Sequence, residues 1–178
     1  LGLMLLALTL IREISAPLKT SNVLPILIKP LSEPFVAIFF SAILTWSLHS
    51  SLAAVLLYAA LATQEMITAN QALYLVMGAN LGAGFIALTA TYRDGWAVRR
   101  LSVMNIIMKF ITAIIILSAL PFFREQFMTL NVHQIVLNLH TGFNLVLALL
   151  FLPLTGLLAR LAVKIMPDRE STADEFAP

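Results

Sequence analysis

The sequence has no cysteine and very little charge. Of its 178 residues only 11% are charged and 60% are hydrophobic, and the mean hydropathy is +0.94. A soluble domain carries about 25% charged residues, so this chain has too few charges to cover a water-facing surface. The absence of cysteine excludes disulfides, thiolate metal ligands and cysteine nucleophiles. The composition therefore predicts an integral membrane protein in a lipid bilayer, and a net charge of only +2 argues against nucleic acid as a partner.

Acidic residues are missing from the apolar segments. All nine carboxylates lie in predicted loops or in the C-terminal tail. A membrane enzyme with paired acids, or a proton pump with a buried carboxylate relay, needs at least one of them inside the bilayer. The H-E-x-x-H, G-x-S-x-G and P-loop motifs are also absent from the sequence. We therefore expect no enzyme activity, no cofactor and no metal centre.

Charged and proline-rich stretches divide the chain into segments. Residues 1–11 are apolar but shorter than the roughly 20 residues that cross a bilayer, and we interpret them as the end of a truncated transmembrane helix. Residues 12–34 are a proline-rich linker, residues 35–166 a transmembrane repeat, and residues 167–178 a cytoplasmic linker or tail. Within the repeat we expect a hairpin at 35–63 and helices at 72–92, 101–123 and 135–165.

The segment 35–63 has a polar centre, Thr45 to Ser51. Two half-length helices that meet there would form a re-entrant hairpin, which needs protein or a water-filled cavity around its irregular backbone. One tilted helix is the alternative. A single span puts nine Lys and Arg on one side against Arg124 on the other, whereas a hairpin gives six against four. The positive-inside rule favours the single span, and both arrangements place the C-terminus in the cytoplasm.

A second polar interruption lies at Gly78 to Gly84, which contains three glycines and Asn80. Gly78 and Gly82 have the GxxxG spacing of closely packed membrane helices. Glycines also weaken a helix, and two broken hydrophobic segments are typical of transporter sites. In such sites half-helix N-termini bind anions, while unwound carbonyls and hydroxyls coordinate Na⁺. Ser50 and Ser51 supply hydroxyls in the first break, although many membrane serines bond only to their own helix.

Lys109 is the only Lys or Arg well inside an apolar segment. A buried membrane cation marks a functional site or an internal pair, although Lys109 lies close enough to the start of its segment to reach the interface by snorkelling. His140 and Asn144 are four residues apart and share one helical face. We interpret them as supporting residues, because a lone membrane histidine more often forms a hydrogen bond between helices than it binds a ligand.

The order of these motifs resembles the sodium-dependent phosphate cotransporter family, in particular the bacterial branch that often carries a PhoU-like domain. Such proteins are all-α and have two inverted repeats, each with a Gln-Ser-Ser-Ser-like and a Gly-Ala-Asn-(Ile/Leu)-Gly-like motif. The chain resembles the second repeat nearly end to end. The matching elements, in chain order, are Ser50-Ser51, Gly78-Ala79-Asn80-Leu81-Gly82, Arg99-Arg100, His140-Thr141-Gly142-Phe143-Asn144 and Leu152-Pro153.

The resemblance implies a role for each matching residue. Ser50 and Ser51 correspond to the substrate and sodium motif, and Asn80 to a further sodium ligand. Gly78 and Gly82 correspond to a broken helix whose N–H groups and carbonyls face the ligands. The supporting element corresponds to His140, Phe143 and Asn144.

The sequence also departs from the family pattern. His49 stands where the family has Gln, Leu52 where it has a third Ser, and Lys109 where it commonly has Asn. Ala83 and Gly84 replace the hydroxyl residues that usually follow the Gly-Ala-Asn motif. These departures remove oxygens from the presumed Na⁺ shell.

The function implied by the resemblance is membrane transport of inorganic phosphate, coupled to sodium, by alternating access. The site would form between this chain and a missing N-terminal repeat in the inner (plasma) membrane, and a PhoU-like cytoplasmic domain is a further expected partner. Because histidine changes charge near neutral pH, pH dependence through His49 is a hypothesis. The alternatives are a carrier or exporter of another small anion, and a non-transporting scaffold for a cytoplasmic regulatory domain.

Overall fold

The computed structural model describes residues 28–167 and, before them, the single positions 2, 6, 9, 10, 13, 17 and 26. The predicted helix end at 1–11, most of the linker 12–34 and the tail after residue 167 lie largely outside the described residues. The positions of those predicted segments therefore remain predictions.

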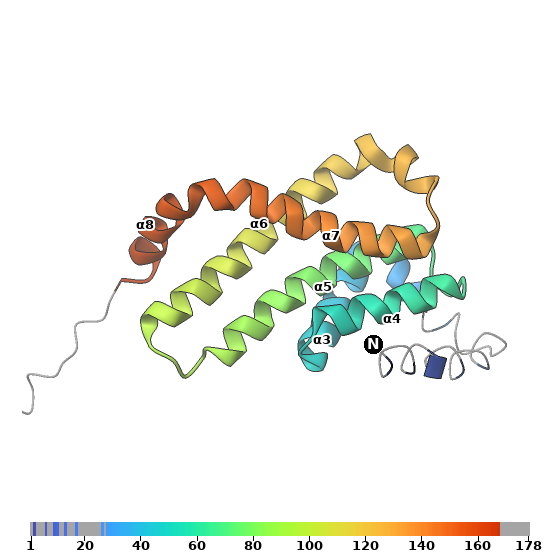
Figure 1. The fold of residues 1–178 in the computed structure, drawn as a ribbon, viewed down its shortest axis with the longest axis horizontal. Helices are drawn as coiled ribbons and strands as arrows, with labels where there is room; N and C mark the ends of the chain where they lie inside the picture. The colour runs from blue at the N-terminus through green and yellow to red at the C-terminus, as the bar shows by residue number, and fades with distance from the viewer. Residues whose placement is uncertain are drawn as a thin grey trace, which may run out of the picture.

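The described part of the chain is helical throughout, and no strand occurs between residues 28 and 167 (Figure 1). Three stretches are long and apolar enough to cross a membrane, namely Ala69–Ala90, Trp96–Phe123 and Val132–Ile165. The predicted all-α membrane bundle is thus confirmed. Its elements are the 3₁₀ helix η1 (Lys29–Ser32), α3 (Pro34–Leu48), α4 (Ser51–Thr63), α5 (Ala69–Ala90), α6 (Trp96–Met128), α7 (Val132–Phe151), the 3₁₀ helix η2 (Leu152–Leu154) and α8 (Thr155–Ile165).

The polar segment around His49 separates two helices and reverses the chain. His49 ends α3 in the left-handed conformation (φ 51°, ψ 25°), and its N–H donates to the Trp46 carbonyl. Ser50 is extended and caps α4, because its side-chain oxygen accepts from the Ala53 N–H at 3.1 Å. The Ser41 and Tyr58 hydroxyls, 2.7 Å apart, then join α3 to α4 as antiparallel neighbours. A single tilted helix over this segment is therefore excluded.

Helix α5 runs without a break through Gly78, Asn80 and Gly82, so the predicted broken helix at this motif is wrong. The physical reason is close packing against α3. A Cβ atom at Gly78 would lie 2.6 Å from the Ser41 Cβ, and one at Gly82 would lie 2.8 Å from the Thr45 Cβ. Each glycine costs a helix about 1 kcal/mol relative to alanine, and this contact between the two backbones offsets that cost. The structure therefore agrees with the alternative interpretation of Gly78 and Gly82 as a GxxxG motif for close helix packing.

Several helix boundaries differ from the predicted ones. Helix α5 begins at Ala69 rather than at 72, because Thr68 and Gln71 form a reciprocal capping box. Helix α6 extends over Trp96–Met128 and contains Pro121. The predicted helix 135–165 is divided into α7, η2 and α8, because Pro153 lacks the N–H that a continuous helix needs.

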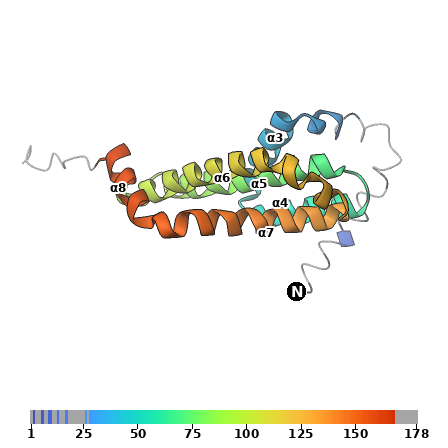
Figure 2. The same ribbon diagram turned by 90° about the horizontal axis from the view of Figure 1, so that it is seen from above.

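The helices pack around α5. Figure 2 shows α3 and α7 on opposite sides of α5. Gly78 on α5 faces Ser41 on α3, and Gly82, one turn later, faces Thr45, which is one turn later on α3. The helices α3 and α5 therefore run parallel. Helix α4 is therefore antiparallel to α5. Helix α6 is also antiparallel to α5, because it begins where α5 ends and the Ser102 hydroxyl donates to the Ala87 carbonyl at 3.2 Å.

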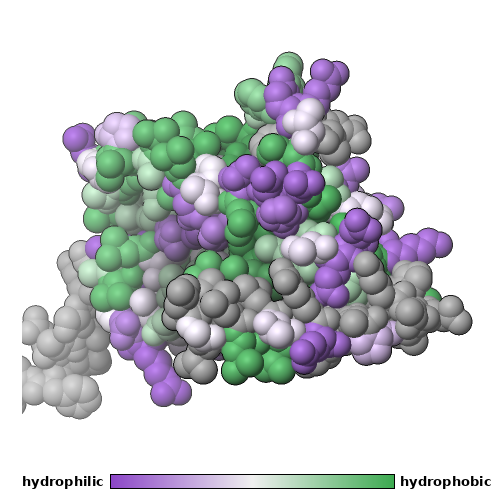
Figure 3. Space-filling model, turned by 45° about the vertical axis from the view of Figure 1, so that its right-hand side comes forward, coloured by the Kyte–Doolittle hydropathy of each residue, from purple (hydrophilic) through white to green (hydrophobic). Residues whose placement is uncertain are grey.

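The bundle has an apolar core around α5 that also encloses a few polar side chains, and many large apolar side chains lie on its outer surface. Figure 3 shows hydrophobic residues over much of one face, with hydrophilic groups gathered in patches. Phe35, Leu101 and Phe122 are 88%, 73% and 82% exposed. In water such a surface would be unfavourable, whereas in a bilayer it contacts hydrocarbon.

Candidate functional site

The first candidate site is the hairpin tip, which we define as His49, Ser50 and Ser51. Ser50 and Ser51 are partly buried, whereas the His49 side chain is exposed. The His49 Nδ1 lies 3.2 Å from the Ser47 carbonyl oxygen. Within residues 28–167 no hydrogen bond engages the Ser51 hydroxyl. The Ser50 oxygen already accepts the Ala53 N–H, and its own hydroxyl proton remains available as a donor.

The geometry of the tip places two helix ends of opposite polarity together. The N-terminus of α4 carries the N–H groups of Ser51 and Leu52, which lie in the first turn of the helix and have no carbonyl within it to accept them. This end has a partial positive charge and suits an anion. The C-terminus of α3 ends at the same tip. Its last carbonyls carry a partial negative charge, which suits a cation, although the Trp46 carbonyl already accepts the His49 N–H.

A buried hydroxyl network supports the tip from below. The Ser41 hydroxyl donates to the Leu75 carbonyl at 2.5 Å and accepts from the Tyr58 hydroxyl at 2.7 Å. The Thr45 side chain is fully buried, and its oxygen has no hydrogen-bond partner among the described residues. The network connects α3, α4 and α5, so it fixes the angle at which the hairpin enters the bundle.

Sequence reasoning missed this network. Ser41 and Thr45 are four residues apart on α3, and each is 0% exposed. Hydroxyls at that spacing share a helical face, and the spacing was visible in the sequence. Tyr58 gave no such signal, because its position opposite Ser41 follows only from the reversal of the chain at His49.

The second candidate site is a cluster of amide and imidazole groups between α5 and α7, here called the amide cluster: Asn80, His140 and Asn144. The Asn144 Nδ2 donates to the Asn80 Oδ1 at 3.3 Å and to the His140 carbonyl at 2.8 Å. The Asn80 Nδ2 donates to the Val76 carbonyl at 2.9 Å. The His140 Nδ1 is buried and has no hydrogen-bond partner within the described part of the chain. The structure thus joins the Asn80 and Asn144 side chains across α5 and α7, and it places His140 one helical turn before Asn144 on α7.

Lys109 enters this region from α6 and is only 9% exposed. Its Nζ lies 5.7 Å from the centre of the Phe143 ring on α7. Its stem lies beside Gly84 on α5, where an added Cβ would be 3.3 Å from the Lys109 Cδ. The snorkelling alternative therefore does not describe Lys109, because both the stem and the ammonium group lie between helices.

The hairpin tip and the amide cluster lie at similar depths in the bundle. The Ser41 hydroxyl joins Tyr58 on α4 to Leu75 on α5. Ser51 lies seven residues before Tyr58, and Gly82 lies seven residues after Leu75. Because α4 and α5 are antiparallel, both steps run in the same direction by roughly 10 Å at about 1.5 Å per residue. Ser51 is therefore near the level of Gly82, close to the amide cluster, and no hydrogen bond between described residues joins the two groups.

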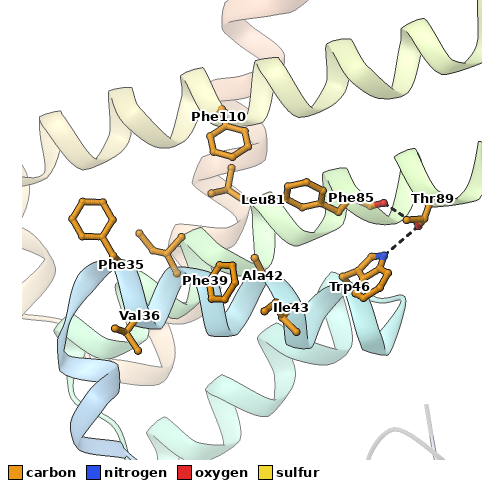
Figure 4. A pocket seen from close by; sticks show the side chains of 11 residues that line it. Phe35, Val36, Phe39, Ala42, Ile43, Trp46, Leu81, Phe85, Thr89 and Phe110 are labelled. Atoms are coloured by element: carbon orange, nitrogen blue, oxygen red, sulfur yellow. Dashed lines mark hydrogen bonds between the residues drawn. The ribbon is translucent and has the colours of Figure 1, made fainter. Parts of the chain in front are cut away.

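A large apolar groove lies elsewhere on the bundle. Its volume is about 810 Å³, and it opens between α3, α5 and α6 (Figure 4). A hydrogen bond of 3.3 Å from the Trp46 Nε1 to the Thr89 hydroxyl lies at one end. This lining suits hydrocarbon and not phosphate. It consists of Phe35, Val36, Ile38, Phe39, Ala42, Ile43, Trp46, Leu81, Phe85, Thr89 and Phe110.

The fold and the placement of its polar groups define an integral membrane helical bundle. The chain belongs to the Na⁺/Pi-cotransporter family, because the model of that family matches residues 3–157. The resemblance noted in the sequence is thereby confirmed, and this is a family of transporters. Among residues 28–167 no group of three or more His, Cys, Asp and Glu side chains is placed to hold a metal ion.

Curated relatives cover the whole chain. It is 32% identical over 181 residues to the "Putative inorganic phosphate export protein YjbB" of Escherichia coli (strain K12), and the match covers 100% of this chain and 33% of that protein. The protein of the same name from Salmonella typhimurium is also 32% identical, over 184 residues, with the same coverage. The uncharacterized protein YqeW of Bacillus subtilis is 28% identical over 75% of this chain and 44% of its own length. No solved structure matches the chain.

Proposed function

We propose that the protein containing this chain transports inorganic phosphate across a membrane, and that phosphate binds at the hairpin tip. The observation that carries the proposal is the start of α4 at Ser51, near the middle of the spans α5 and α7, with Ser50 as its cap. Membership of the Na⁺/Pi-cotransporter family and a relative named for phosphate export support phosphate as the substrate. The chain spans about a third of that relative's length.

Phosphate would be held by neutral donors. The N–H groups of Ser51 and Leu52 and the hydroxyls of Ser50 and Ser51 provide hydrogen bonds at the positive end of a helix. Neutral donors bind an anion without a permanent ion pair. Release of phosphate on the other side of the membrane therefore costs less than release from a site in which an arginine forms an ion pair with it. The hydroxyl network fixes the donors before the ligand arrives.

Sodium coupling is a separate part of the proposal. The carbonyls at the end of α3 and the hydroxyls of Ser50 and Ser51 supply oxygen ligands next to the anion. The Asn80 oxygen, which we expect to be a further ligand, accepts a hydrogen bond from Asn144. Because an amide oxygen has two lone pairs, it could keep this bond and coordinate sodium with the other pair.

Alternating access would require a second set of helices opposite the tip, supplied by the rest of the full-length protein as an inverted repeat. In a membrane the hairpin would then be re-entrant, with its irregular backbone covered by protein.

Charge distribution supports a cytoplasmic C-terminus in a plasma (inner) membrane. The Arg100 side chain donates to the Met166 carbonyl, so the start of α6 and the end of α8 lie at one end of the bundle. A PhoU-like cytoplasmic domain would be attached at this end. The described residues place five Lys and Arg there, against Lys29 and Arg124 toward the other end. The five are Arg93, Arg99, Arg100, Arg160 and Lys164.

The test is phosphate transport by the full-length parent protein in proteoliposomes. Replacing Ser51 by Ala removes one donor to phosphate, and we expect the phosphate KM to rise about tenfold, the effect of roughly 1.4 kcal/mol. Ser47→Ala is the matched control, because Ser47 is an exposed serine near the end of α3. Equal transport by both variants would contradict the site, and transport of sulfate or a carboxylate in place of phosphate would contradict the substrate.

A further inference from the structure

Lys109 is a buried cation that has no counter-ion among the residues that the structure describes. No carboxylate lies within ion-pair distance of its ammonium group, and no hydrogen bond engages that group, among the residues that the structure describes. The face of the Phe143 ring is its electrostatic contact, at 5.7 Å. A charge in this position is costly in a bilayer, and a ring face offsets only part of the cost.

The surrounding helices accommodate Lys109 specifically. Gly84 on α5 leaves room for its stem, because a Cβ there would lie 2.9 Å from the Ile106 Cγ1 and 3.3 Å from the Lys109 Cδ. Phe143, which it faces, is fully buried. The buried His140 Nδ1, also without a partner among described residues, lies one helical turn before Phe143. A charge that is this enclosed, and that has no ion pair among the described residues, would be stabilised by an anion that enters the region.

The phosphate that we propose to bind at the hairpin tip is an anion that would lie at a depth similar to that of Lys109. Gly84 lies two residues beyond Gly82, whose level on α5 matches that of Ser51. The tip belongs to α4 and the lysine to α6, and both helices pack against α5. Phosphate at the tip would therefore lie at a depth in the bundle similar to that of Lys109.

We propose that Lys109 is a resident cation that attracts the substrate oxyanion electrostatically and takes over part of the role of a coupling cation. The proposal rests on the phosphate site at the hairpin tip. Lys109 acts through its field and does not need to contact the phosphate. At an effective dielectric constant of about 20, a unit charge changes the affinity for a monovalent anion about tenfold at a separation of roughly 10 Å, and by less at a greater separation.

The test measures phosphate transport by the full-length protein in proteoliposomes, with and without sodium, for three variants. Lys109→Met keeps the length and apolar stem of the side chain but removes the charge, and Lys109→Arg keeps the charge. Lys164→Met is the matched control, because it removes a charge from an exposed position on α8. Inorganic phosphate is the probe, and choline replaces sodium.

We expect Lys109→Met to raise the phosphate KM about tenfold with a smaller change in kcat, and to increase the stimulation by sodium. Lys109→Arg and Lys164→Met should stay within about twofold of the wild type. Lys109→Met should also unfold at the same or a higher temperature, because an apolar side chain replaces a buried unpaired charge. A purely structural role predicts the opposite, a destabilised variant.

Two results would overturn the inference. One is an unchanged phosphate KM in Lys109→Met. The other is equal impairment of Lys109→Met and Lys109→Arg, which would assign the effect to side-chain shape. Failure of the proposed function gives a different result, because the wild-type protein would then transport no phosphate in any condition.

Discussion

Asn144 on α7 donates a hydrogen bond to Asn80 on α5, with 3.3 Å between its Nδ2 and the Asn80 Oδ1. Asn80 is 1% exposed, and its own Nδ2 is bonded to the Val76 carbonyl. The pair therefore links two membrane spans through a fully buried amide, at the depth of the hairpin tip.

Removing this link should destabilise the protein modestly. Hydrogen bonds between membrane helices contribute about 0.6 kcal/mol on average, and Asn144→Ala would also leave the Asn80 oxygen buried without a partner. We expect a loss of about 1 kcal/mol in the free energy of unfolding of the full-length protein in detergent. Asn138→Ala, on the same helix but outside the pair, is the control. A loss no larger than that of the control would show that the pair does not hold α7 to α5.

The glycines of α5 give a sharper prediction. A Cβ at Gly78 would collide with the backbone of α3 and the Ser41 Cβ, whereas a Cβ at Gly142 on α7 would meet nothing within 4 Å. Gly78→Ala should destabilise the protein by about 1–3 kcal/mol through overpacking. Gly142→Ala should be neutral or stabilising by up to about 1 kcal/mol through helix propensity. The measurement is thermal unfolding of each purified variant, and a reversed order would contradict the packing of α3 on α5.

The sequence predicted the class of fold and the position of the helix break at the candidate site, because both depend on composition and on local pattern. The scarcity of charge identified a membrane protein, and the polar centre around Ser50 identified the position of a helix break. The outcome at Gly78–Gly82 was not predictable in the same way. Glycine weakens a helix and also permits close packing, and only the position of α3 decides between these effects.

Tertiary contacts also decided the environment of the polar residues. The sequence did not decide whether Lys109 is buried or reaches the membrane interface. In the structure it is buried, because its side chain packs beside Gly84 and faces the Phe143 ring. Tyr58 became part of the site only through the reversal of the chain, which the positive-inside count had argued against. Residues far apart in the sequence meet through the packing of helices, which local patterns do not specify.

The most direct test of the phosphate site uses a single cysteine at Ser51. The sequence described here contains no cysteine, so Ser51→Cys gives a unique thiol once any cysteines elsewhere in the full-length protein are replaced. The rate of labelling by a membrane-impermeant thiol reagent is measured with and without phosphate and sodium. We predict labelling from water that phosphate slows, and slows further with sodium, while Ser47→Cys is unaffected. Labelling of Ser51→Cys that is indifferent to phosphate, or no labelling from either side, would contradict a substrate site at the hairpin tip.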